Sequence, residues 1–289
     1  MIKLNTSIDC KIIAEKIKDE VVAEVMKIQG RRPGLAIILI GDRPDSELYV
    51  KLKEQEAKKV GIDTHLYRCL EDISEREVFS MIDFLNKDDS VDAILVQLPL
   101  PDKFDTDGII LALDKNKDVD RFHPDNLKIF LQTCDHEPLM PPVCKVVVRI
   151  LSEIGFDPKD KIAGVLSNSD LFGKVLAHAL SCLGAKTSLI KSTDPDWVEK
   201  SRVCDLLASA VGKPHFIGKE AIKEGAVVVD IGIGKLDGKV CGDVDFEDAK
   251  DKAAYITPVP GGVGPLTIAM LFNNVLSIYG QRKRNYEQE

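Results

Sequence analysis

Short apolar runs alternate with helical segments along most of this chain, and this alternation constrains its fold more than any other feature. Apolar runs typical of buried strands occur at residues 35–40, 91–97, 161–166, 186–190 and 226–230. Segments with helical periodicity, or with helix-ending glycine and proline, lie between them. Strands that alternate with helices form mainly parallel sheets through right-handed crossovers. The sequence therefore predicts an α/β protein whose ligands bind beyond the carboxyl ends of its strands.

Length and composition narrow the function classes. The 289 residues correspond to about two domains of roughly 100–200 residues each. A net charge of −8 without a basic run argues against a nucleic-acid partner. We expect no membrane partner, because no apolar run approaches membrane-spanning length. The seven cysteines are scattered without a CxxC pair, which favours reduced thiols in the cytoplasm and offers no metal site.

The first candidate site is a tyrosine–lysine pair in the segment that follows the strand at residues 35–40. Pro44 and Gly61 bound this segment as helix punctuation, and Tyr49 and Lys53 are four residues apart on one helix face. If the pair is partly buried, desolvation lowers the pKa of the lysine and makes it usable as an acid or base. The alternative is a solvated helix face on which the lysine extends to water.

Two further polar residues follow buried segments of the first half. Gln97 ends the strand at residues 91–97, where its amide could contact a heterocycle or simply meet water. Asp120 lies in a loop, where its carboxylate could accept hydrogen bonds from an aminopyrimidine-like edge. A turn or cap role is the alternative for Asp120. We interpret His123, beside a proline in the same loop, as structural.

The second half contains a strand, a turn and a helix that could bind a phosphate through helix N-terminal amides. The turn is Ser167-Asn168-Ser169, so serines occupy the first two glycine positions of a GxGxxG pattern, and only Gly173 remains. The next strand ends at Lys191 and Ser192. A lysine and a serine there suit a 2′-phosphate, which favours NADP over NAD.

A loop rich in glycine and proline precedes the last helix. Residues 257–265 contain three glycines and three prolines, which exclude a regular element. Such a loop is rigid, and its backbone can approach a flat ligand closely.

Six motifs together resemble the bifunctional methylenetetrahydrofolate dehydrogenase/methenyltetrahydrofolate cyclohydrolase (FolD) family, in order and over nearly the whole chain. They are Ser46 with Tyr49 and Lys53, residues 96–101, residues 118–124, residues 210–214, residues 242–246 and residues 257–265.

The resemblance implies a fold of two α/β domains. A catalytic, folate-binding domain would comprise residues 1–141, completed by a C-terminal helix at residues 266–289 that packs back on it. Residues 142–265 would form a Rossmann-like NADP-binding domain. The resemblance also implies a cytoplasmic homodimer that associates through the NADP-binding domains.

The resemblance also assigns roles to residues. Lys53 would transfer the proton in the cyclohydrolase step, Tyr49 would position substrate and lysine, and Gln97 would tune the lysine. Asp120 would hold the pterin ring. The tetrahydrofolate substrate would further contact Val96, Leu98, Pro260, Gly261, Gly262, Val263 and Gly264. NADP would contact Ser167, Asn168, Ser169, Lys191, Ser192 and Ile233, and no metal is implied.

The implied reactions belong to one-carbon metabolism. They are the NADP-dependent oxidation of 5,10-methylenetetrahydrofolate to 5,10-methenyltetrahydrofolate and the hydrolysis of that product to 10-formyltetrahydrofolate. The chain departs from the family pattern at Ser167-Asn168-Ser169, usually Gly-Arg-Ser, and at Arg121, usually glycine. Two alternatives therefore stay open, a cyclohydrolase with weak or lost NADP binding and a non-catalytic folate-binding or dimer-partner subunit. Restoring glycine at Ser167 is expected to tighten NADP binding.

Overall fold

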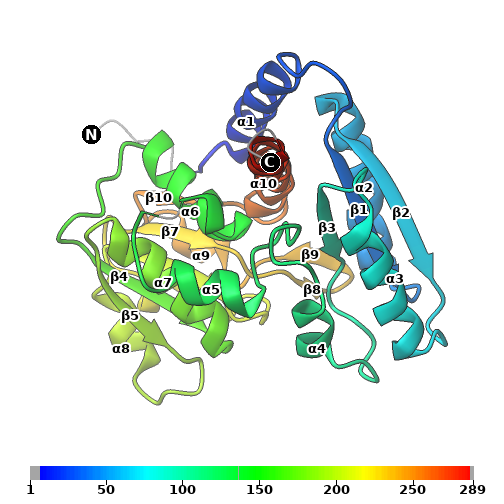
Figure 1. The fold of residues 1–289 in the computed structure, drawn as a ribbon. Helices are drawn as coiled ribbons and strands as arrows, with labels where there is room; N and C mark the ends of the chain where they lie inside the picture. Colours follow the sequence, from blue (N-terminus) through cyan, green and yellow to red (C-terminus); the bar gives the residue numbers. More distant parts are fainter. Residues whose placement is uncertain (1–6, 136, 287–289) are drawn as a thin grey trace. The chain divides into compact units, whose positions relative to one another are not determined.

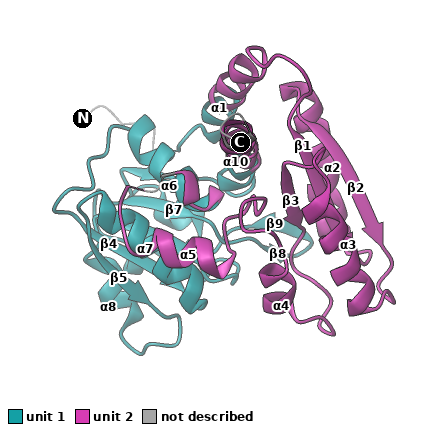
Figure 2. Cartoon of the chain, viewed as in Figure 1, with its two compact units in different colours: residues 1–15, 143–267 teal, residues 16–142, 268–289 magenta. Residues whose placement is uncertain are grey.

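The computed structural model describes residues 7–135 and 137–286, which form two compact units (Figures 1 and 2). Unit 1 contains residues 7–15 with Val143–Thr267, and unit 2 contains Lys16–Pro142 with residues 268–286. Both units are discontinuous in sequence, because helix α1 (Cys10–Val25) and helix α10 (Val263–Tyr286) each begin in unit 1 and continue in unit 2. The domain boundaries implied by the resemblance stay a prediction.

Unit 2 is built on a three-stranded parallel sheet of order β2-β1-β3. Its strands are β1 (Gly34–Ile40), β2 (Asp63–Cys69) and β3 (Ala93–Val96). Every residue of β1 is buried, because the strand is central and helices cover both faces of the sheet. The other elements of unit 2 are α2 (Pro44–Val60), α3 (Glu75–Lys87), α4 (Thr106–Leu111), α5 (Pro124–Phe130) and the 3₁₀ helix η1 (Glu137–Leu139).

Successive residues of β1 point to opposite faces, so unit 2 has two cores. Leu35, Ile37 and Leu39 belong to one core, with side chains of α1, α2 and α10. Ala36, Ile38 and Ile40 belong to the other, with side chains of α3 and α4. The C-terminal helix therefore packs in the core of the first half of the chain, as predicted.

Helix α10 requires one correction to the sequence analysis. It is long and apolar enough to cross a membrane by length and composition, although no run of that length was expected. Its buried side chains Leu271, Phe272, Val275 and Ile278 lie in the same core as β1. Its apolar composition is accounted for by this packing.

Unit 1 is built on a five-stranded parallel sheet of order β10-β7-β6-β4-β5. Its strands are β4 (Ile162–Ser167), β5 (Lys186–Ile190), β6 (Leu206–Ala210), β7 (Val227–Asp230) and β10 (Tyr255–Ile256). The remaining elements are α6 (Pro142–Glu153), α7 (Asp170–Cys182), α8 (Trp197–Arg202), the 3₁₀ helix η2 (Lys219–Ala221), α9 (Phe246–Ala249) and the hairpin of β8 (Gly234–Leu236) and β9 (Lys239–Cys241).

The strand order of unit 1 creates a point where the chain changes direction across the sheet. The chain runs from β4 to β5 on one side, and then returns to place β6 on the other side of β4. The loops after β4 and β6 therefore diverge at the carboxyl edge. Open parallel sheets bind ligands at such a point.

Candidate active site

Helix α2 carries the predicted tyrosine–lysine pair. Pro44 opens the helix, and Gly61 ends it in the left-handed conformation with φ of 80°. Tyr49 is partly buried and packs against the core that contains β1. The helix thus anchors the ring of Tyr49 in the unit while Lys53, one turn later, extends toward β3.

Lys53 and Gln97 meet although they are 44 positions apart in sequence. The Lys53 Nζ donates a hydrogen bond to Gln97 Oε1 at 2.8 Å. Gln97 Nε2 donates to the Leu98 carbonyl at 2.7 Å, which keeps the amide oxygen toward the lysine. The backbone N–H of Gln97 donates to the Ile38 carbonyl at 2.9 Å and holds the residue at the end of β3.

Burial shifts the pKa values of three residues in this site. Desolvation lowers the pKa of Lys53, and the negative charge of Asp120 partly opposes that shift. Burial raises the pKa of Asp120 to about 6, although the charge of Lys53 acts in the opposite direction. The pKa of Tyr49 is raised by burial and by Asp45, so its phenol remains a neutral hydrogen-bond donor. The charges of Lys53 and Asp120 thus act on each other's pKa.

The loop that presents Asp120 is held on both sides. Asn274 of α10 donates from Nδ2 to the Val119 carbonyl at 2.9 Å. On the other side, the buried Asp118 carboxylate accepts from the backbone N–H of His123 at 2.8 Å and from Asn126 Nδ2 at 3.3 Å. Asp120 is therefore presented by a loop with little freedom to move.

His123 is a structural residue, as interpreted from the sequence. Its Nδ1 accepts a hydrogen bond from the Asp125 backbone N–H at 3.1 Å and caps helix α5. Its Nε2 lies 3.3 Å from the Leu111 carbonyl, which can only accept. Both ring nitrogens of His123 thus have a backbone partner.

Arg121 stands at the position where the family pattern usually has glycine. Its φ is 61°, in the left-handed region that favours glycine, and its side chain is 1% exposed. The conformation explains why glycine is usual here in the family pattern. The charge of Arg121 lowers the pKa of Asp118 against the larger raising effect of burial. The departure from glycine was the one sequence signal that pointed to this position.

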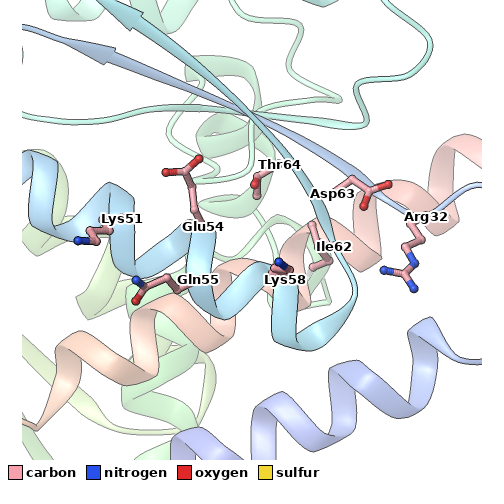
Figure 3. Close-up of a pocket in the computed structure, with 8 residues that line it drawn as sticks. All are labelled: Arg32, Lys51, Glu54, Gln55, Lys58, Ile62, Asp63 and Thr64. Carbon is pink, nitrogen blue, oxygen red and sulfur yellow. The ribbon is translucent and has the colours of Figure 1, made fainter.

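A groove beside helix α2 is a different feature from this site. It has a volume of about 530 Å³ and is lined by Arg32, Lys51, Glu54, Gln55, Lys58, Ile62, Asp63 and Thr64 (Figure 3). Its α2 members repeat at helical spacing along a stripe beside the edge strand β2. None of the predicted site residues lines this groove.

In unit 1, the turn after β4 adopts a serine-based conformation. Ser167 Oγ accepts a hydrogen bond from the Ser169 backbone N–H at 3.2 Å, and Ser169 Oγ accepts from the Phe172 N–H at 3.3 Å to cap α7. None of the three residues of the turn has a positive φ, so the turn does not need the conformational freedom of glycine. A Cβ at Gly173 would lie 2.3 Å from the Leu189 side chain, so glycine allows close helix–strand packing there.

The predicted nucleotide-binding residues of β4 and β5 lie together. Asn168 Oδ1 accepts from Ser192 Oγ at 2.9 Å and from the Ser192 N–H at 3.2 Å. Lys191 Nζ donates to the Asn168 carbonyl at 3.0 Å and forms an ion pair with Asp170. A hydroxyl, an ammonium and a helix N-terminus on one sheet edge form a donor set that fits a phosphate. Ile233 lies apart from these contacts, in the loop after β7, and is half-exposed.

The remaining predicted substrate contacts belong partly to unit 2 and partly to unit 1. In unit 2, Val96 is buried in β3, and the following Leu98 is exposed. In unit 1, Pro260 precedes Gly261, whose φ of 92° suits only glycine, and a Cβ at Gly262 would lie 2.1 Å from the Pro258 carbonyl. Val263 and Gly264 form the start of α10. The glycines of this loop are thus required by its backbone.

Comparisons with known proteins match both halves of the chain. The family model for the catalytic domain of tetrahydrofolate dehydrogenase/cyclohydrolase matches residues 8–120, and the model for its NAD(P)-binding domain matches residues 141–283. Bifunctional protein FolD of a Nitratiruptor species is 43% identical over 281 residues, which cover 96% of this chain and 99% of that protein.

Two solved structures are similar over almost their whole length. The crystal structure of the bifunctional enzyme FolD from Campylobacter jejuni has a TM-score of 0.91 at 39% identity, covering 95% of this chain and 98% of that one. The Trypanosoma brucei enzyme, solved with NADP cofactor and an inhibitor, has a TM-score of 0.91 at 32% identity, with 96% and 98% covered. The chain therefore belongs to the tetrahydrofolate dehydrogenase/cyclohydrolase family of bifunctional enzymes.

Proposed function

We propose that this chain carries out the two reactions of its family with NADP⁺ as hydride acceptor and with Lys53 as the proton-transfer residue. The first reaction oxidises 5,10-methylenetetrahydrofolate to the methenyl cation, and the second hydrolyses that cation to 10-formyltetrahydrofolate. The observation that carries the proposal is the hydrogen bond between Lys53 Nζ and Gln97 Oε1 at 2.8 Å, together with the lowered pKa of the lysine.

The hydrolysis step needs a group that takes a proton from water at neutral pH. Water adds through its oxygen to the one-carbon bridge, and neutral Lys53 takes the proton that water loses. The bond from this carbon to N5 then breaks as the added hydroxyl becomes the formyl carbonyl. Lys53 returns its proton to N5, and the hydroxyl proton is released to water. A lysine with its ordinary pKa is almost entirely protonated at pH 7, so the desolvation that lowers the pKa of Lys53 makes this role feasible.

The neighbouring residues position the lysine and the substrate. Gln97 holds the lysine amine through its carbonyl, and Tyr49 offers a neutral phenol as a donor. Asp120 offers a carboxylate to the N–H donors of the pterin ring, and its charge adjusts the pKa of Lys53. The substrate contacts proposed for residues 96, 98 and 260–264 rest on the family resemblance.

The donor set at the ends of β4 and β5 supports NADP as the nucleotide. Ser192 and Lys191 would hold the 2′-phosphate, and the capped N-terminus of α7 would face the pyrophosphate. When bound, NADP⁺ supplies hydride acceptance, and the protein supplies orientation. The serine-based turn supports retained nucleotide binding, because serine can adopt its backbone conformation without strain.

The homodimer through unit 1 and the cytoplasmic location are further parts of this proposal, supported by the resemblance.

Two assays on the purified protein test the proposal. Methylenetetrahydrofolate is supplied with NADP⁺, with NAD⁺ or without nucleotide, and methenyltetrahydrofolate hydrolysis is followed separately. We expect reduction of NADP⁺ in preference to NAD⁺, together with hydrolysis. Hydrolysis without reduction of either nucleotide would show that the chain is a cyclohydrolase only. No activity in either assay would favour a binding or partner role.

A further inference from the structure

A chain of hydrogen bonds links three loops at the carboxyl edge of the unit 1 sheet. Lys213, in the loop after β6, donates from Nζ to Ser192 Oγ at 3.3 Å. Ser192, after β5, in turn donates from Oγ to Asn168 Oδ1, after β4, at 2.9 Å. Lys213 therefore reaches across β4 to the residues proposed for the 2′-phosphate, although no sequence motif predicted a role for it there.

The position of Lys213 is determined at its backbone. Asp243, which is fully buried, accepts hydrogen bonds from the Lys213 N–H at 2.8 Å and from the Val211 N–H at 2.6 Å. Both carboxylate oxygens are thus used to hold this loop in one conformation. A Cβ at Gly232 would lie 2.1 Å from the Asp243 carboxyl carbon, so the loop after β7 closes tightly over the same carboxylate.

The ammonium of Lys213 is positioned by an aromatic pair. Its Nζ lies 5.0 Å from the centroid of the Phe216 ring, at a distance typical of a cation–π contact. Phe216 stacks on Trp197 of α8, with ring centroids 4.5 Å apart. Among the described residues no carboxylate pairs with Lys213, whereas Lys191 forms an ion pair with Asp170. A fixed, exposed cation beside a hydroxyl is complementary to a phosphate dianion.

We propose that Lys213 is a specificity-determining residue that binds the 2′-phosphate of the nucleotide together with Ser192 and Lys191. The inference rests on the proposed use of NADP and adds a second cation to its recognition. Asp243 is the positioning residue for this lysine. NADH lacks the 2′-phosphate, so the contact contributes to NADPH binding alone.

The test measures nucleotide binding to Lys213→Gln without substrate. Trp197 is the only tryptophan of the chain and lies beside this edge, so energy transfer from it to bound NADPH or NADH reports occupancy. Lys186→Gln is the matched control, because Lys186 is an exposed lysine at the amino end of β5, on the opposite edge of the sheet. Methenyltetrahydrofolate hydrolysis checks that each variant is folded.

We expect Lys213→Gln to raise the Kd for NADPH about tenfold or more, while the Kd for NADH and the hydrolysis rate stay within twofold of wild type, as for Lys186→Gln. An equal loss for both nucleotides, or an unchanged preference for NADPH, would overturn the role of Lys213. A wild-type protein without preference for NADPH would instead overturn the proposed nucleotide, so the two failures are distinguishable.

Discussion

Lys53 of helix α2 donates a hydrogen bond to the side-chain carbonyl of Gln97 at the end of β3, across 2.8 Å. The partner is a neutral amide, so this hydrogen bond itself brings no counter-charge to the lysine. Desolvation is the main influence on its pKa, which is lowered. The arrangement holds an amine in place while favouring its neutral form.

Replacing Lys53 with methionine should abolish most of the hydrolase activity. General acid–base groups contribute about 10²–10⁴-fold to rates, so we expect a loss of that order in kcat for methenyltetrahydrofolate hydrolysis. Lys51→Met is the matched control, since Lys51 is an exposed lysine on the same helix. Near-normal hydrolysis in Lys53→Met would remove the lysine from its proposed role.

The same variant should change how stability depends on pH. The folded-state pKa of Lys53 is lowered, so the unfolded chain binds this proton more tightly and the free energy of unfolding rises with pH up to the unfolded value of 10.5. Lys53→Met removes this slope. The free energy of unfolding of the variant should therefore exceed that of wild type most at neutral and acid pH. Urea unfolding from pH 6 to 10 measures the difference, and parallel curves would contradict it.

Asp120→Asn should shift the pH profile of hydrolysis toward lower pH. The negative charge of Asp120 raises the pKa of Lys53, so its removal lets that pKa fall further and neutral lysine form earlier. The measurement is kcat against pH, because loss of a substrate contact would act mainly on KM. If the rising limb of the kcat–pH curve stays in place or moves to higher pH, the charge of Asp120 does not control the pKa of Lys53.

Asp120→Asn should also alter stability in acid. The folded pKa of about 6 exceeds the ordinary value of 3.8, so the folded state retains a proton that the unfolded state loses. The contribution of Asp120 to the free energy of unfolding is fully present below pH 3.8 and is lost as the pH rises to about 6. The variant should lack this decline, which thermal melting in that pH range can detect.

Arg121→Gly should be more stable than Arg121→Ala. Both variants lose the same buried side chain, and only alanine retains a Cβ at a φ of 61°. The left-handed conformation costs roughly 1–2 kcal/mol for a residue with a Cβ, so we expect a difference of that size. Comparison of urea midpoints at equal m values measures it, and equal stability would show that the backbone relaxes.

Ser167→Gly should not tighten nucleotide binding, in contrast to the expectation from the family pattern. The serine occupies an ordinary backbone conformation, and its Oγ accepts the Ser169 N–H at 3.2 Å. Glycine removes this hydrogen bond, which contributes about 1 kcal/mol, and loosens the turn. Titration with NADPH and thermal melting give the result. A clear decrease in the Kd would restore the original expectation.

Much of the fold could be predicted from local pattern. The strand expected at residues 35–40 is β1, and the helix bounded by Pro44 and Gly61 is α2. The last helix packs with the first half of the chain, as the resemblance implied. The strand expected at residues 91–97 is shorter in the structure, where β3 comprises only Ala93–Val96. Element boundaries depend on local turns and hydrogen bonds, which periodicity does not specify.

The sequence by itself determined the α/β class, the family and the residue types at the proposed sites, because periodicity, turn residues and motif spacing are local properties of the chain. Only the tertiary structure decided that Lys53 meets Gln97, that Arg121 occupies a left-handed conformation, and that Lys213 reaches Ser192. These features depend on distances through space and on removal of water. Both arise only when distant segments pack together.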